Sequence, residues 1–215
     1  MNFVFFPKYF GDIDQMEEAS MDPNVWGPSL WDLLFFISFN VDMKEKCSDV
    51  KHLFQLLEVV LPCSQCRRHY ALYRKEVPPT TIINKREEDS AAQWLWTIHD
   101  MVNQNLGKIC MDYQSLVKKH KSLSCIVHDL TIYDLFMIMW FSSKNKKKLC
   151  EGMNLIIKLL RTISKFHVCD VFVENIIENW EVSDMLHKKN MILRYYNKNE
   201  QTLEDFVMQY TNAMA

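Results

Sequence analysis

The sequence contains little glycine and little proline, with four glycines and six prolines among its 215 residues. Because these two residues form most tight turns, their scarcity argues against a fold built from many short strands. Hydrophobic residues make up 48% of the chain, and 13 Met and 13 Phe are among them. This content can bury a sizeable core and excludes a disordered chain. We therefore expect an all-α protein.

An excess of charge of one sign is also missing, since the formal net charge is only −2. A nucleic-acid-binding protein usually carries a broad basic surface, whereas the short lysine run at 144–148 is typical of a solvated loop. We expect no nucleic-acid partner.

The chain lacks a long apolar run as well. Its longest one, at 130–141, is interrupted by Asp134 and falls short of the roughly 20 residues that a membrane span requires. The N-terminal segment reaches Pro7 without a basic leader or an apolar core of signal-peptide length. We expect neither a signal peptide nor a membrane partner.

The seven cysteines are odd in number and irregularly spaced, which argues against the disulfide framework of a small secreted protein. Two of them stand close together in LPCSQCRRHY, as Cys63 and Cys66. A CxxC pair can bind a metal, exchange a disulfide or simply lie buried in the core. Zinc usually needs four ligands, and no second CxxC occurs, although His69, Cys47 and His52 could contribute. We expect no metal site.

The position of the pair favours redox chemistry. Pro62 suits a helix entry and places Cys63 in the first turn, with Cys66 on the same face. There the unsatisfied N–H groups and the helix dipole stabilise a thiolate, and Arg67 and Arg68 add positive charge. The helical flanks argue against a thioredoxin-like site, which needs a strand before the motif. A metal-binding or non-catalytic helical scaffold remains the alternative.

Periodic apolar residues predict helices along most of the chain. The first begins near Pro28 within 24–41, and the second is capped by Ser48 or Asp49 and ends before Pro62. Beyond the helix that holds the cysteines, further helices are expected at 90–107, 129–141, 149–166, 168–180, 183–195 and 201–213. The predicted division is an N-terminal extension at 1–23, one helical domain at 24–115 and a C-terminal helical domain at 129–215, with 114–128 between the last two.

Three stretches, in this order, resemble the Erv/ALR family of FAD-dependent sulfhydryl oxidases: WGPSLWDLL, LPCSQCRRHY and WLWTIHDMVNQNLGK. The resemblance covers about residues 24–115. It implies a four-helix bundle with a short fifth helix around FAD. It also implies that Cys63 exchanges with the substrate dithiol, and that Cys66 passes the electrons to flavin and on to dioxygen, giving hydrogen peroxide.

By the same resemblance, ten side chains would line the FAD: Trp26, Trp31, Phe35, His69, Tyr70, Trp94, His99, Val102, Asn103 and Lys108. The residue types suit that task. Tryptophan faces can stack on rings, His99 and Asn103 share a helix face at i, i+4, and Lys108 can neutralise a phosphate.

The sequence departs from the family at four positions. Phe35 stands where many members have histidine, and Asp100 where they usually have asparagine. Trp96 and Tyr113 occupy the two positions that form a structural disulfide in cellular relatives. Phe35, the stretch LPCSQCRRH and the missing disulfide resemble the enzymes of large DNA viruses, which implies action in the host cytoplasm and on virion proteins.

No second CxxC is available to carry electrons from bulky substrates to the first. We therefore expect Cys63 itself to be exposed beside a shallow groove, where a protein dithiol such as a small thioredoxin-like protein would dock. Apolar stripes in the C-terminal half, such as Leu155, Leu159 and Ile163 or Ile176, Ile177 and Trp180, need a covering surface. We expect that half to act as an internal companion in place of the homodimer of small relatives.

Overall fold

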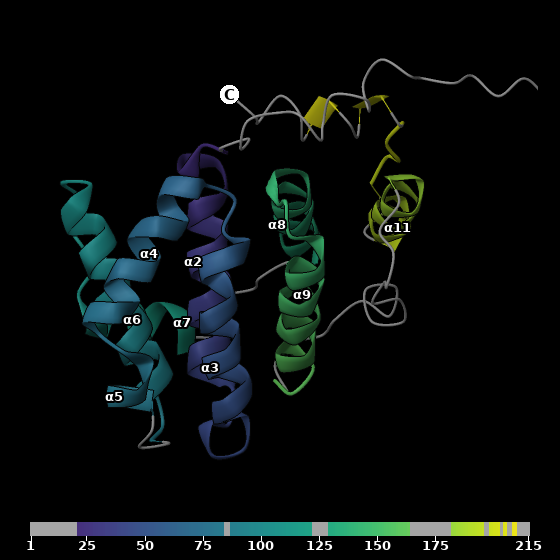
Figure 1. Cartoon of the computed structure of the whole chain (residues 1–215). Coiled ribbons are helices and arrows are strands. Elements are labelled where there is room, and N and C mark those ends of the chain that lie inside the picture. Colours follow the sequence, from purple (N-terminus) through teal and green to yellow (C-terminus); the bar gives the residue numbers. More distant parts are fainter. Residues whose placement is uncertain are drawn as a thin grey trace, which may run out of the picture.

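A computed structural model describes residues 21–83, 87–121, 129–163, 182–195 and 198–202, together with positions 204, 205, 208 and 209. Within these residues the regular structure is helical and contains no strand, which confirms the all-α prediction (Figure 1). None of the helices in this part of the chain combines the length and the apolar character that a bilayer crossing demands. The predicted helix at 168–180 lies outside the described residues.

The first part of the chain forms a helical bundle of four long helices and two shorter ones. Their bounds are α2 Pro23–Asn40, α3 Met43–Val60, α4 Ser64–Glu76, α5 Pro79–Ile83, α6 Ser90–Asn105 and α7 Tyr113–Lys121. Helix α6 contacts α2, α4 and the short α5, while α7 lies against α2. This arrangement places the segment after Pro62 beside the segment that begins at Ser90.

Two helices begin earlier than their predicted starts, because aspartate side chains cap them. The Asp22 carboxylate accepts a hydrogen bond from the Asn24 N–H at 2.9 Å, so α2 starts at Pro23 rather than near Pro28. The Asp42 carboxylate accepts one from the Lys44 N–H at 2.8 Å, and α3 therefore begins before Ser48. The sequence offered several residues of the N-capping type, and local pattern alone did not select among them.

The C-terminal part adds three described helices, α8 Asp129–Ser142, α9 Lys146–Leu160 and α11 Val182–Tyr195. Helix α8 packs on α2 and α9 packs along α3, while α11 contacts α8 (Figure 1). Polar contacts reinforce the α3 and α9 pair, since Lys158 Nζ lies 2.9 Å from Asp49 Oδ2 and His52 Nε2 lies 2.8 Å from Glu151 Oε1. The C-terminal helices α8 and α9 thus pack on α2 and α3 of the first part of the chain.

The second half of helix α2, from Leu33 to Phe39, is buried on every side, which is unusual for a helix of a small domain. Leu33, Leu34 and Ile37 have no more than 1% of their surface exposed. Helices α6 and α7 cover one side of α2 and α8 covers another. The predicted stripe of Leu155, Leu159 and Ile163 is also buried, whereas Ile176, Ile177 and Trp180 lie outside the described residues.

Candidate active site

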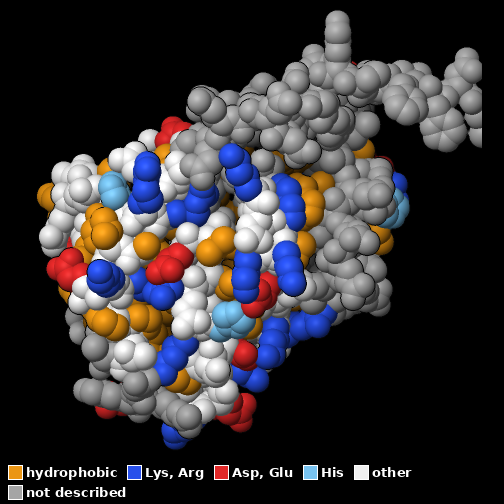
Figure 2. Space-filling model, in the orientation of Figure 1, with side chains coloured by type: hydrophobic (Ala, Val, Ile, Leu, Met, Phe, Trp, Pro, Cys, Tyr) orange, Lys and Arg blue, Asp and Glu red, His pale blue; other side chains and the backbone are white. Residues whose placement is uncertain are grey.

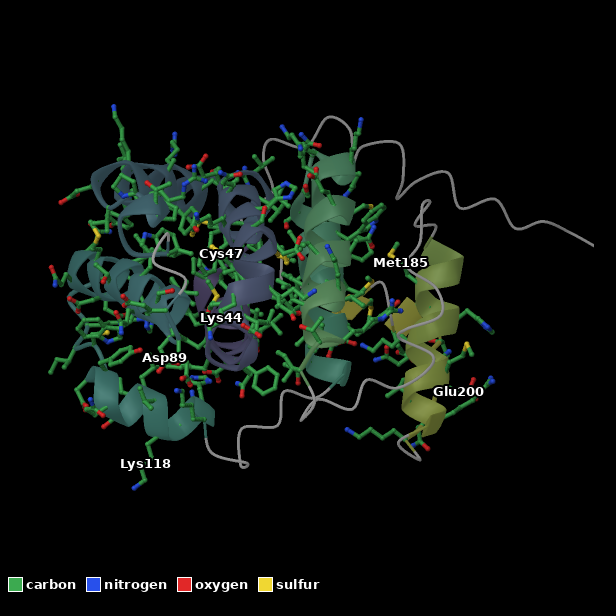
Figure 3. The ribbon with its side chains drawn as sticks, turned by 90° about the horizontal axis from the view of Figure 1, so that it is seen from below. Lys44, Cys47, Asp89, Lys118, Met185 and Glu200 are labelled. Atoms are coloured by element: carbon green, nitrogen blue, oxygen red, sulfur yellow. A yellow bond between two sulfur atoms is a disulfide. The ribbon has the colours of Figure 1, made fainter. Side chains whose placement is uncertain are left out.

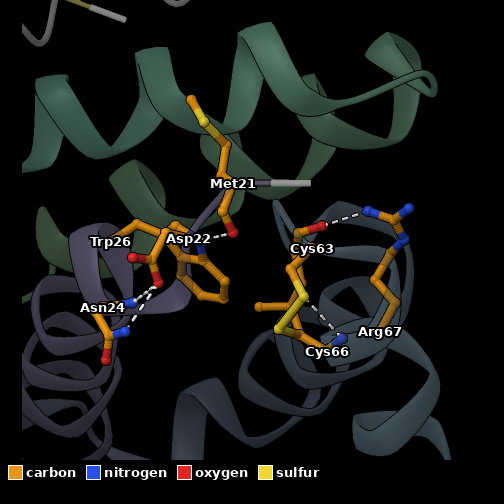
Figure 4. Close-up of a disulfide and its surroundings, with 8 residues drawn as sticks. Met21, Asp22, Asn24, Trp26, Cys63, Cys66 and Arg67 are labelled. Carbon is orange, nitrogen blue, oxygen red and sulfur yellow. Dashed lines mark hydrogen bonds between the residues drawn. A yellow bond between two sulfur atoms is a disulfide. The ribbon is translucent and has the colours of Figure 1, made fainter. Parts of the chain in front are cut away.

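The two cysteines of the CxxC motif form a disulfide at the start of α4 (Figure 4). Their Cα atoms are 5.1 Å apart, which is within the usual range for a disulfide. Cys63 is the N-cap residue of α4, and its sulfur accepts a hydrogen bond from the Cys66 N–H at 3.1 Å. The Arg67 guanidinium reaches back and donates to the Leu61 carbonyl at 2.6 Å. The helix terminus therefore directs its N–H groups at sulfur, as predicted.

The expectation that Cys63 is exposed is wrong, because only 5% of its surface is accessible, whereas Cys66 is half-buried. The chain before α2 crosses the α3–α4 connection next to the cysteines. The Met21 N–H donates to the Pro62 carbonyl at 3.3 Å, and Trp26 Nε1 donates to the Met21 carbonyl at 3.2 Å (Figure 4). This contact joins residues about forty positions apart, so the sequence pattern contained no signal for it.

A second group of side chains lies between α2 and α6. The rings of Trp31 and His99 have centroids 4.4 Å apart, and Phe35 lies 5.7 Å from His99. The Asn103 Nδ2 atom lies 3.4 Å from His99 Nε2, as the i, i+4 spacing predicts. Burial lowers the pKa of His99, so its imidazole is neutral near pH 7. The structure thus brings together four of the ten predicted cofactor-binding residues as a partly exposed aromatic cluster.

His120 of α7, which sequence reasoning did not select, packs on the other side of Phe35. Its ring lies 5.5 Å from that of Phe35 and 6.0 Å from that of Phe39, nearly parallel to the latter. Its Nε2 atom is 3.6 Å from Asp32 Oδ1, and burial lowers the pKa of His120 to about 4. A histidine therefore stands next to the position at which many family members have one, but it comes from a helix 85 positions later.

Three other predicted residues are buried in the core with hydrogen-bond partners in the protein. Trp94 is fully buried against Phe54, with ring centroids 4.7 Å apart, and its Nε1 donates to the Val77 carbonyl at 2.9 Å. The Tyr70 hydroxyl donates to the Phe54 carbonyl at 2.8 Å, and Trp26 Nε1 donates to the Met21 carbonyl. They fix the frame on which the disulfide and the aromatic cluster are mounted, and direct contact of these three with FAD stays a prediction.

The last three predicted residues are accessible. His69 is half-buried on α4 with its ring 6.2 Å from that of Tyr73, and Val102 is half-buried on α6. Lys108 is exposed in the segment that follows α6. The Lys108 N–H donates to the Asn103 carbonyl at 2.8 Å, so the backbone joins this segment to the aromatic cluster.

Trp96 and Tyr113 lie against each other at the two positions where cellular relatives are expected to carry a disulfide. Their ring centroids are 5.8 Å apart with an interplanar angle of 70°, an edge-to-face contact. Trp96 Nε1 also donates to the Met111 carbonyl at 2.9 Å. Two aromatic residues thus join α6 to the start of α7, a contact that sequence reasoning recorded only as two missing cysteines.

Three further cysteines of the described residues are free thiols: Cys47 is buried, while Cys110 and Cys150 are half-buried. Cys125 and Cys169 lie outside the described residues. Within the part of the chain that the structure describes, no group of three or more His, Cys, Asp or Glu side chains is arranged to hold a metal ion.

Comparison with known proteins shows a similarity over the same segment. The profile of the Erv1 / Alr family matches residues 28–121. Two plant proteins, each named FAD-linked sulfhydryl oxidase ERV1, are 26% identical to the chain over 102 residues. The one from Arabidopsis thaliana aligns over 46% of this chain and 51% of its own length, and the one from Oryza sativa subsp. japonica over 46% and 50%.

A protein of Acanthamoeba polyphaga mimivirus, named Probable FAD-linked sulfhydryl oxidase R368, is also 26% identical over 102 residues, which are 46% of this chain and 70% of that protein. The chain therefore spans about half the length of the two plant relatives. No solved structure matches the chain. Residues 28–121, which contain the disulfide and the aromatic cluster, are therefore similar to the Erv1/Alr family.

Proposed function

We propose that the chain is an FAD-dependent thiol oxidase that introduces disulfides into protein substrates. The observation that carries this proposal is the Cys63–Cys66 disulfide at the N-terminus of α4, within the segment that matches the Erv1/Alr family. The relatives support it, since all three are named as FAD-linked sulfhydryl oxidases.

The chain's own part in the reaction is thiol–disulfide exchange. A substrate thiolate attacks Cys63 Sγ, so that a bond forms between the two sulfurs while the Cys63–Cys66 bond breaks and Cys66 leaves as a thiolate. The second substrate thiol, after losing its proton to solvent, then attacks the substrate sulfur of the mixed disulfide. This step releases the oxidised substrate and a Cys63 thiolate. The Cys66 N–H at 3.1 Å and the N-terminal end of the helix dipole stabilise that thiolate.

The aromatic cluster fits an aromatic cofactor. Trp31 and His99 offer ring faces 4.4 Å apart from two helices, and neutral His99 with Asn103 offers hydrogen-bonding atoms for a polar ring edge. Exposed Lys108 would place a positive charge near a phosphate. Bound FAD would supply the two-electron acceptor for the Cys63–Cys66 dithiol and the route from there to dioxygen, with hydrogen peroxide as the product.

A protein dithiol is the proposed substrate, delivered by a small thioredoxin-like protein, because the chain contains no second CxxC. The likeness to a viral protein makes the host cytoplasm and the virion the proposed places of action.

Purification of the full chain tests the proposal directly. We expect a yellow protein with the visible absorbance of flavin, which consumes dioxygen when dithiothreitol is added and produces an equal amount of hydrogen peroxide. A protein that stays colourless after incubation with FAD, or that consumes no dioxygen in the presence of dithiol, would overturn it.

A further inference from the structure

The turn between α8 and α9 lies at the same end of the bundle as the disulfide. Helix α9 runs antiparallel to α3, because Lys158 pairs with Asp49 near the start of α3, while a Cβ atom added to Gly152 would lie 3.8 to 3.9 Å from Leu56 and Val60 near its end. Lys146, the first residue of α9, is six residues before Gly152, or about 9 Å further along the axis. The N-terminus of α9 therefore extends past the end of α3, to the level at which α4 and the cysteines begin.

Basic side chains gather at this end from two elements far apart in the sequence. Arg68 is exposed on the first turns of α4, two residues after Cys66. Lys144 and Lys147 are exposed in the α8–α9 turn and the first turn of α9. We call Arg68, Lys144 and Lys147 the basic rim. Figure 2 shows Lys and Arg side chains distributed over the face that α3 and α9 form.

The acidic side chains at this end are engaged elsewhere. Glu58 lies 3.1 Å from Arg74, Glu151 pairs with Lys148 at 2.7 Å and with His52, and Asp22 caps α2. In the described part of the chain, none of the three rim side chains makes an ion pair. Even with the Asp22 carboxylate, which accepts only neutral hydrogen bonds, the three rim charges leave an excess of positive charge at the end of the bundle that holds the disulfide, although the whole chain has a net charge of −2.

We propose that the basic rim docks an acidic segment of the protein substrate next to its dithiol. This inference rests on the proposed thiol oxidase function and specifies its substrate class. A localised positive patch accelerates the encounter with a negatively charged partner and orients it, while contributing less to the bond-making step. Because Cys63 is 5% exposed, an orienting contact outside the disulfide is needed to hold a substrate thiol in line with its sulfur.

A protein segment fits the rim better than nucleic acid does. The rim consists of three exposed charges beside a redox pair, whereas a nucleic-acid surface uses a longer basic stripe that neutralises many phosphates. A disulfide is also of use only to a partner that contains thiols.

Binding of a peptide that contains no thiol tests the basic rim separately from the thiol–disulfide exchange. The probe is a short fluorescent peptide with Glu and Asp around a Ser-x-x-Ser centre, compared with the same peptide carrying Gln and Asn. We expect the full-length protein to bind the acidic peptide at least about tenfold more tightly at low salt, and the difference to vanish at about 0.5 M salt. Equal affinity for the two peptides, or tighter binding of an oligonucleotide of equal charge, would overturn the inference.

Matched charge reversals locate the site. Lys144→Glu with Lys147→Glu should abolish the preference for the acidic peptide. The control pair, Lys44→Glu with Lys118→Glu, makes the same change in net charge on exposed lysines of α3 and α7 and should leave the preference intact (Figure 3). If both pairs reduce the preference equally, the effect comes from net charge and the rim is not a docking site.

Turnover separates this inference from the proposed function. With reduced Cys-x-x-Cys versions of the peptides, the rim variant should lose about tenfold in kcat/KM for the acidic substrate. Its turnover of uncharged dithiothreitol should equal that of the wild type. If the wild type does not turn over dithiothreitol, the oxidase function is contradicted. If the rim variant keeps the wild-type ratio of kcat/KM for the acidic and the neutral peptide, the docking surface is contradicted.

Discussion

Cys63 occupies the N-cap position of α4, where serine, threonine, asparagine and aspartate are usual. A thiol sulfur is a weak hydrogen-bond acceptor, but a thiolate is a strong one, so the Cys66 N–H favours the ionised form. In the proposed exchange, the residue that caps the helix is therefore the one whose sulfur leaves and returns as a thiolate. The sequence predicted that Cys63 lies in the first turn of a helix that begins at Pro62, whereas α4 begins at Ser64 and Cys63 is its N-cap.

Single serine substitutions test the division of labour between the two cysteines. Either Cys63→Ser or Cys66→Ser should abolish dithiol turnover, because each removes one partner of the exchange, and Cys63→Ser keeps an N-cap oxygen so that α4 still forms. Cys63→Ser should leave a Cys66 thiolate whose charge-transfer band with bound flavin is visible, and Cys66→Ser should accumulate a mixed disulfide through Cys63.

The matched control is Cys150→Ser, which changes a half-buried free thiol outside the proposed site and should leave turnover unchanged. Normal oxidation of dithiothreitol by either active-site variant would contradict the assignment. A mixed disulfide trapped through Cys110 or Cys150 would show that an internal shuttle exists.

His120 makes the stability of the fold depend on pH. Burial lowers its pKa to about 4 in the folded state, from an ordinary value near 6.5. Between those two values the unfolded chain binds a proton that the folded chain does not, so stability falls as the pH falls through this window. From about pH 7.5 to about pH 5 the loss from this one group is about 2 kcal/mol.

His120→Gln should remove that loss, since glutamine does not titrate. Urea unfolding at the two pH values measures it, and the wild type should lose about 2 kcal/mol more than the variant on acidification. An identical pH dependence in both proteins would show that His120 is protonated in the folded state, paired with Asp32. The sequence could not predict this histidine, because its environment is made by Phe35 and Phe39 of a distant helix.

Aromatic residues join α6 to α7 at the two positions where cellular relatives are expected to have a disulfide. The Trp96–Tyr113 contact and the Trp96 to Met111 hydrogen bond hold the connection that carries Lys108. An edge-to-face pair and one hydrogen bond together contribute about 2 kcal/mol. The resemblance to the family implied that two cysteines are replaced here, but only the packing shows how Trp96 and Tyr113 contact each other.

Trp96→Ala should lower the free energy of unfolding by about 2 kcal/mol and weaken flavin binding, because the segment with Lys108 is released. The double variant Trp96→Cys with Tyr113→Cys should recover the stability when oxidised and lose it again in reductant. Thermal unfolding with and without reductant measures this. If reductant does not change the melting temperature of the double variant, a disulfide cannot take the place of the Trp96–Tyr113 contact.

At the scale of whole helices, the long helices could be predicted, while the starts of α2 and α3 could not, and the short α5 and α7 fall in segments that were expected to be connections. Apolar periodicity reports which residues face a core, and it therefore identified both halves of the chain as helical. It does not show which elements pack against each apolar face. The burial of residues 33–39 of α2 on every side and the position of Met21 beside Pro62 therefore followed only from the packing.

For the molecule as a whole, the C-terminal helices α8 and α9 cover the faces of α2 and α3. We propose that residues 129–215 act as an internal companion of the Erv1/Alr domain, on the surface that small relatives are expected to bury by dimerisation. The buried residues support this, since Leu56 and Val60 of α3 are buried beside Gly152 of α9.

Removal of the companion should expose an apolar surface that needs another cover. A chain ending after Lys121 keeps α7 in place and should form dimers or aggregate, whereas the full chain should be monomeric by sedimentation. Val60→Asp in the shortened chain places a charge on the exposed face of α3, near the end of that helix, and should make the shortened chain monomeric, while Lys118→Asp, on the exposed surface of α7, should not. A shortened chain that is soluble, monomeric and fully loaded with flavin without any substitution would show that α2 and α3 need no companion, and that the C-terminal half serves another purpose.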